Sequence, residues 1–285
     1  MALSFSGHET FTCRNYWLKK GLDHVWSGGS FNNLAIKELG VGKNMVRAIH
    51  FWSRAFGLLE SSDQYTKIAK YIFKTRDGKD PYLEDVGTIW LLHFMLVTSE
   101  VASIYHLVFN FFRKTRLEFD KEQLLSYLES QCQLNQQKYS VNSLKKDISV
   151  FLRNYQVPEK SKSIESDFMG ILHELELIDR VGKAGYNLTY RIDSKERKTL
   201  PAKIVLACIL LRHENTTITF NELLTSVNSV GSVFSVNSKY LMDCIDQFCA
   251  AYPNNLVYKD DAGVQVLQVK EGLDLFTVLN DYYGK

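Results

Sequence analysis

The sequence has no excess of charge of either sign. Its 285 residues carry 34 lysines and arginines against 32 aspartates and glutamates, which gives a formal net charge of +2. A chain with this balance does not attract nucleic acid through its overall field, so any nucleic-acid surface must be a local patch. The 45% hydrophobic content indicates a folded chain, and the length fits two or three modest domains.

Paired cysteines and a secretion signal are also missing. The five cysteines form no CxxC pair, which argues against a zinc knuckle and a disulfide framework and favours a reducing cytoplasm. The first residues contain no basic segment followed by an apolar one, so we expect no secretion signal. The cysteines are Cys13, Cys132, Cys208, Cys244 and Cys249.

One apolar run, residues 89–112, has the length of a membrane span but not its composition. His93 and Glu100 interrupt it, and Glu100 would lie near the middle of a bilayer. A charge there costs about 2.5–3.5 kcal/mol on the most lenient insertion scale. We therefore expect two buried helices that meet near residues 98–100, and no membrane segment.

The usual catalytic signatures are absent as well. The chain has no Ser-His-Asp order, no HExxH and no Cys/His pair at an informative spacing. The GVGK at residues 40–43 is not a phosphate-binding Walker A loop, because Lys37 stands where that loop needs glycine and Asn44 where it needs serine or threonine. These glycines suit a turn between two helices.

The order of elements predicts a mainly α protein with small β-hairpin wings, built from tandem winged-helix or helix-turn-helix modules. We expect an N-terminal helix-turn-helix domain over residues 1–117, a middle winged-helix-like domain over 118–200 and a C-terminal one over 201–285. The sequence SVNS opens a helix at residue 140 and again at residue 235, and a predicted hairpin follows each helix. This repeat indicates two related units.

Several local elements can be predicted within these domains. Ser143 is a plausible N-cap for a helix over residues 140–155. The expected helices also include 167–178, 201–214, 218–227 and 235–253, and the expected hairpins are 179–192 and 256–269, the second turning near residues 261–263.

The helix that follows the GVG turn carries a basic stripe. Lys43, Arg47, His50 and Arg54 fall at i, i+4, i+7 and i+11, with Asn44 beside them and no acidic residue in the line. The second helix of a helix-turn-helix reads DNA, so we interpret this stripe as a DNA-binding surface. The alternative is an ordinary solvated helix face. The opposite, buried side is expected to hold Met45, Ile49, Trp52 and Phe56.

The corresponding helices of the other two units differ in charge. The middle helix carries Lys145, Lys146 and Arg153, which we expect to make secondary contacts with the DNA backbone, although a structural role is equally compatible with them. The C-terminal helix carries Asp243 and Asp246 where a DNA-facing helix needs cations. We expect that unit to pack against a protein partner, against another copy of itself, or against nothing.

Two groups are candidates for catalysis. His8 and Glu9 are the catalytic candidates near the start, and Asp80, Glu84 and Asp85 offer three carboxylates that suit Mg²⁺ or Mn²⁺. Such an ion would polarise a phosphodiester and activate water. The alternative for the three carboxylates, which we favour, is an acid-rich start of the apolar helix that follows.

Three motifs together resemble a known family. SGHETFTCRNYWLKKG, ELGVGKNMVRAIHFWSRAFGLLE and DPYLEDVGTIWLLHFMLV, all within about the first 110 residues, resemble the family numbered 4007 among domains of unknown function, whose members are encoded beside bacterial DNA phosphorothioation enzymes. The remaining chain matches only in general layout. The family's GVGKNMVRAI block coincides with the basic stripe.

The resemblance implies a cytoplasmic anti-phage defence protein that binds double-stranded DNA and nicks it where sulfur enters. The implied partners are a cysteine desulfurase, an ATP-dependent sulfurtransferase and an ATPase. Three hypotheses follow: a metal-dependent nicking endonuclease, a non-catalytic DNA-recognition scaffold, and a transcriptional regulator that binds a promoter as a homodimer.

Overall fold

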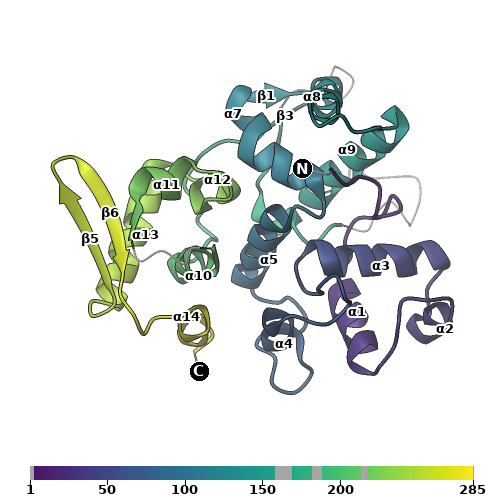
Figure 1. Ribbon diagram of the computed structural model, residues 1–285, viewed down its shortest axis with the longest axis horizontal. Helices are drawn as coiled ribbons and strands as arrows, with labels where there is room; N and C mark the ends of the chain where they lie inside the picture. The colour runs from purple at the N-terminus through teal and green to yellow at the C-terminus, as the bar shows by residue number, and fades with distance from the viewer. Residues whose placement is uncertain (1–2, 158–168, 182–187, 213–216, 285) are drawn as a thin grey trace. The chain divides into compact units, whose positions relative to one another are not determined.

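The computed structural model describes residues 3–157, 169–181, 188–212 and 217–284. It is mainly helical, with two small antiparallel sheets, as the sequence predicts (Figure 1). The chain divides into two compact units, residues 1–192 and 193–285. The finer division into three domains stays a prediction.

The first unit begins with three helices and a short hairpin. Helix α1 (Trp17–Trp26) contacts both α2 (Ala35–Leu39) and α3 (Lys43–Ala55). Between α2 and α3 the chain turns at Gly40, whose φ of 62° lies in the left-handed region that glycine adopts without strain. The prediction of a helix, a glycine turn and a second helix is therefore confirmed.

A hairpin that the sequence did not reveal follows α3. Leu59 forms a bridge with Tyr65, and the Thr66 amide donates to the Leu58 carbonyl at 3.0 Å. The Thr66 hydroxyl then accepts from the Ala69 amide and caps α4 (Lys67–Phe73). Three helices and a hairpin thus follow one another in residues 17–66.

The apolar run forms two helical segments, as predicted. Helix α5 (Val86–Ser99) ends at Glu100, whose φ is 62°, and α6 (Ser103–Leu107) continues through the π-helical turn η1 (Val108–Phe112) into α7 (Arg113–Thr115). Among the described residues no single helix is long and apolar enough to cross a membrane. The two segments satisfy that requirement only when taken together, and they are bent by 95° to each other.

The rest of the first unit surrounds a three-stranded sheet of order β1-β3-β2. Both pairings are antiparallel, and Tyr190 of β3 stands opposite Phe119 of β1 and Arg180 of β2. Asp120 and Gln123 form a capping box that starts α8. The elements are β1 (Glu118–Phe119), α8 (Lys121–Leu134), α9 (Val141–Tyr155), β2 (Asp179–Val181) and β3 (Thr189–Arg191).

Two details of the sequence-based prediction were wrong in this region. The N-cap of α9 is Ser140, so Ser143 lies inside the helix. The helix expected over residues 167–178 is reduced, in its described part from residue 169, to the 3-10 turn η3 (His173–Leu175). Gly170 lies so close to Asn154 that an added Cβ would stand 2.5 Å from its Cα, and Glu176 has a φ of 47°. This packing constraint is not visible in an apolar periodicity.

The second unit also contains a three-stranded sheet, of order β4-β6-β5, which corresponds to the order β1-β3-β2 in the first unit. The segment predicted as a helix over residues 218–227 begins as a strand and becomes helical only at Phe220. The predicted turn of the last hairpin is confirmed, with positive φ at Ala262 and Gly263. The elements are α10 (Ala202–Arg212), β4 (Thr217–Thr219), α11 (Phe220–Thr225), α12 (Val230–Phe234), α13 (Ser238–Ala251), β5 (Leu256–Asp261), β6 (Val264–Val269) and α14 (Leu275–Tyr282).

Candidate nucleic-acid interface

The basic stripe lies along α3, and its N-terminal half is the exposed half. Lys43 and Asn44 open the helix and are exposed, and the Arg47 side chain is 56% exposed. Ile49, Trp52 and Phe56 are fully buried, whereas Met45 is only partly covered. The helix therefore presents three polar residues at its start and anchors its other side in the core.

The stripe has acidic partners from outside the helix, which the sequence did not reveal. Arg47 forms an ion pair with Glu9 at 3.2 Å. His50 lies 2.6 Å from Asp63 and stacks on Phe31, with the ring centroids 4.4 Å apart. The absence of acidic residues along α3 itself is therefore not an absence of acidic partners. His50 is held in place by these contacts.

The N-terminal segment, residues 3–14, connects α3 to α9. The Phe11 carbonyl accepts from the Trp52 indole at 3.1 Å, and the Cys13 amide donates to Asn154 at 3.1 Å. Gly7 lies against the Phe51 ring so closely that an added Cβ would stand 2.2 Å from it. The glycine of the SGHETFTC motif thus allows this segment to pack closely against Phe51 of α3.

His8 and Glu9, the catalytic candidates, lie in this segment and are both engaged. His8 is 2% exposed, and its Nε2 lies 3.1 Å from the carboxylate of Asp147, which is 3% exposed. The Thr10 amide donates to His8 Nδ1 at 3.2 Å, so the hydrogen is assigned to Nε2. Both ring nitrogens are thereby used within the fold, and the Glu9 carboxylate faces Arg47.

The cations of α9 do not share one environment. Lys145 and Lys146 are exposed, with Lys145 4.0 Å from Glu122. Arg153 instead donates to the Thr10 carbonyl at 2.7 Å and to the Ser149 carbonyl, and its burial lowers the pKa of its guanidinium. Two of the three predicted contacts on α9 therefore face solvent, and Arg153 holds the N-terminal segment.

The three carboxylates after α4 have the geometry of a helix start. The two oxygens of the buried Asp80 accept from the amides of Glu84 and Asp85 at 2.8 and 3.1 Å. Asp85 is the N-cap of α5 and accepts from the Gly87 amide at 2.7 Å. In the described part of the chain no group of three or more metal-ligating side chains comes together. The hydrogen bonds of Asp80 and Asp85 fit the alternative interpretation, an acid-rich helix start.

A basic surface on α4 and the turn that follows it was not predicted from the sequence. Lys67, Lys70, Lys74 and Arg76 are all exposed, and they follow one another at i, i+3, i+7 and i+9. Lys70, Lys74 and Arg76 line one side of a groove of about 870 Å³ that also includes Trp26 and Tyr65. The cation spacing was visible in the sequence, but the aromatic pair comes from α1 and from the hairpin, whose positions needed the fold.

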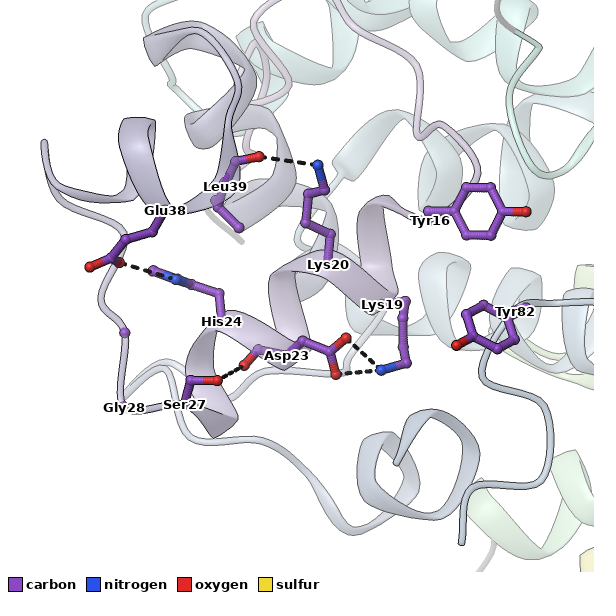
Figure 2. A pocket seen from close by; sticks show the side chains of 11 residues that line it. Tyr16, Lys19, Lys20, Asp23, His24, Ser27, Gly28, Glu38, Leu39 and Tyr82 are labelled. Carbon is purple, nitrogen blue, oxygen red and sulfur yellow. Dashed lines mark hydrogen bonds and ion pairs between the residues drawn. The ribbon is translucent and has the colours of Figure 1, made fainter. Parts of the chain in front are cut away.

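A second hollow, of about 640 Å³, lies beside α1, and its polar side chains are already engaged in contacts within the fold (Figure 2). Lys19 contacts Asp23, Lys20 donates to the Leu39 carbonyl at 3.1 Å, and His24 lies 3.4 Å from Glu38. Lys19 and His24 thus each face a carboxylate, and Lys20 is held by a backbone carbonyl. The hollow is therefore less suited to an anion than the groove beside α4.

Comparisons with known proteins place this fold. Two solved structures are similar over 99% of this chain and 88% of theirs: an SspB crystal structure at a TM-score of 0.85 and 25% identity, and a magnesium-ion-bound SspB crystal structure at 0.86 and 26%. No curated protein sequence matches the chain. The family model described as a protein of unknown function, DUF4007, matches residues 5–283. The chain belongs to the DUF4007 family.

Proposed function

We propose that this protein is the duplex-DNA-binding component of a bacterial DNA phosphorothioation system. The observation that carries the proposal is the exposed start of α3, where Lys43, Asn44 and Arg47 project from the third helix of a three-helix and hairpin unit. In a helix-turn-helix the N-terminal residues of this helix reach base edges. An arginine and an asparagine there are suited to guanine and adenine.

The order of the other elements supports tandem winged-helix modules. In both sheets the third strand lies between the first and the second. Along the chain, two or more helices separate the first strand from the other two. That arrangement is a helical core followed by a hairpin wing. The exposed Lys145 and Lys146 on α9 suit contacts with the DNA backbone, whereas Asp243 and Asp246 on α13 suit a protein partner.

The likeness to SspB supports membership of a phosphorothioation system. We propose further that the protein nicks DNA, which is what the family resemblance of its N-terminal motifs implies. As the resemblance implies, the proposed partners are a cysteine desulfurase, an ATP-dependent sulfurtransferase and an ATPase, all in the cytoplasm. One SspB structure binds magnesium. A divalent ion would supply phosphate polarisation and an activated water. We assign no residue of this chain to that ion.

Non-catalytic recognition is the alternative function. It is favoured by one observation: His8, Glu9, Asp80 and Asp85 all hold hydrogen bonds or ion pairs that build the fold. On this reading the protein selects a site and brings the sulfur-transfer enzymes to DNA.

A supercoiled-plasmid assay with Mg²⁺, Mn²⁺ or EDTA separates the two, with and without the partner enzymes. Metal-dependent open circles support the nickase, and duplex binding without nicks in any lane supports the scaffold. Under either, Arg47→Ala is expected to weaken duplex binding by about 1–3 kcal/mol. Unchanged binding in Arg47→Ala, or binding that does not weaken with added salt, contradicts the DNA interface on α3.

A further inference from the structure

The groove beside α4 is open, basic on one side and aromatic on another. Its volume of about 870 Å³ lies within the range of about 300–1,000 Å³ usual for ligand sites. Three elements form it: the end of α1 with Trp26, the hairpin with Tyr65, and α4 with the turn that follows it. All three belong to the first unit.

The cations of the groove outnumber its carboxylates. Lys70, Lys74 and Arg76 line it together with Asp77 and Asp23. Lys74 forms an ion pair with Asp77 at 3.0 Å, and Asp23 is taken up by Lys19. No side-chain hydrogen bond or ion pair is seen for Lys70 or Arg76 in the part of the chain that the structure describes.

The electrostatic effect of these cations is visible at Asp77. A hydrogen bond from Lys74 is the main cause that lowers the pKa of the Asp77 carboxyl, and the charges of Lys74, Arg76 and Lys70 add to it. The positive charges of all three cations therefore stabilise a negative charge at the position of Asp77, at the edge of the groove. A phosphate group there would meet the same field.

The aromatic side of the groove is a pair of rings. Trp26 and Tyr65 meet edge to face, with centroids 5.8 Å apart and planes at 68°. Tyr65 is 39% exposed although it is a large aromatic residue, and Trp26 is half-buried. An exposed aromatic ring beside cations is the combination by which proteins bind single strands, since bases stack on the rings while cations follow the phosphates.

We infer that this groove binds one unpaired DNA strand, with its phosphates at Lys70 and Arg76 and a base against Tyr65. A duplex does not satisfy the site, because its bases are stacked on one another and offer no face to an aromatic ring. The inference deepens the proposed function and rests on it, since a protein that opens one strand of a duplex produces the ligand that this groove suits.

The test uses the full chain and a fluorescein-labelled oligothymidylate of about 12 nucleotides, within the range of single-strand site sizes. Fluorescence anisotropy is measured over a series of salt concentrations. We expect Lys70→Ala/Arg76→Ala to weaken binding by about tenfold or more and to reduce the salt slope by about 1.4, which is 0.7 for each lost phosphate contact. Both side chains are exposed, so the double variant should fold.

Tyr65 provides a second, independent readout. Tyr65→Ala is expected to weaken binding by about tenfold, whereas Tyr65→Phe retains the ring and most of the affinity. Binding should also quench the fluorescence of Trp26, because Trp17, Trp52 and Trp90 are buried, and Trp26→Phe should abolish the quench. Lys198→Ala, an exposed lysine of the second unit, is the matched control and should bind normally.

The outcomes separate this inference from the proposed role of α3. Arg47→Ala should weaken binding to a duplex of the same length but not to the single strand. If the single strand depends on Arg47 and is indifferent to both groove variants, the inference is overturned. If Arg47→Ala leaves duplex binding unchanged while the groove variants weaken single-strand binding, the proposed role of α3 is wrong and the inference about the groove is supported. The inference would also be overturned if free inorganic phosphate displaced the labelled oligothymidylate as well as unlabelled oligothymidylate does. That result would indicate an anion site without base stacking.

Discussion

Glu9 lies 3.2 Å from Arg47, so a carboxylate from the N-terminal segment is paired with an exposed cation of α3. The two residues are 38 positions apart in the sequence, and the segment that carries Glu9 also contacts α9. The pair is half-exposed, where ion pairs contribute little to stability. Its main effect is therefore on what Arg47 can bind.

The first prediction concerns this pair. Glu9→Gln should tighten binding to duplex DNA by about threefold to tenfold, because it frees Arg47 and removes a charge that repels phosphate. The measurement is a duplex titration by anisotropy at one fixed salt concentration. Glu174→Gln, which changes an exposed carboxylate elsewhere in the unit, is the control. Weaker binding in Glu9→Gln would instead assign Glu9 a positive role in recognition or catalysis.

The second prediction concerns the buried pair of His8 and Asp147. Asp147 accepts from the Ser6 amide at 2.8 Å as well as from His8. Asp147→Ala leaves the buried His8 and the partly buried Ser6 amide without their acceptor, so the free energy of unfolding should fall by about 1–3 kcal/mol. Thermal or urea unfolding measures this, with Asp246→Ala, an exposed position, as the control within about 0.5 kcal/mol. Loss of nicking with unchanged stability would contradict this structural role.

The third prediction separates a helix start from a metal site. Asp85→Ala removes the N-cap of α5 and should cost about 0.5–2 kcal/mol of stability. Asp80→Ala should also destabilise the fold, because it frees two amides. Both losses should be the same in Mg²⁺ and in EDTA. Stabilisation of the unchanged chain by Mg²⁺ that disappears in Asp80→Ala would instead support the metal site.

The pattern of apolar residues predicted the helix α3 and its buried side, but not the acidic partners of its basic residues. The register of α3 followed from periodicity, because Ile49, Trp52 and Phe56 recur at helical spacing and are buried. The partners of Arg47 and His50 did not follow, because Glu9 and Asp63 lie in other segments. Long-range ion pairs leave no local signal in a single sequence.

The hairpin after α3 was missed for a related reason. Its pairing joins Leu59 to Tyr65 through backbone groups, in a stretch too short for any alternation to be recognised. Without that hairpin, Tyr65 could not be placed beside Trp26, and the groove had no aromatic side. The cations of α4 were readable from their spacing, yet a basic helix face alone is typical of many solvated helices.

The last prediction concerns the thiols, since a phosphorothioation system moves sulfur and a sulfur-carrying cysteine needs an accessible thiolate. Cys13, Cys132, Cys208 and Cys244 are buried, and Cys249 is half-buried. Burial raises the pKa of each thiol, to about 11 for Cys244. We therefore expect sulfur to be carried by the partner enzymes.

Brief iodoacetamide labelling at about pH 8, followed by intact-mass measurement, should modify at most Cys249 in the folded chain and all five thiols after unfolding. The unfolded chain releases thiol protons near pH 9, whereas folded Cys244 retains its proton until about pH 11. The unfolded state thus binds fewer protons between these values, and stability should fall as pH rises through that window. Rapid labelling of Cys13 or Cys208 in the folded chain would contradict this prediction, because their burial is what keeps them protonated.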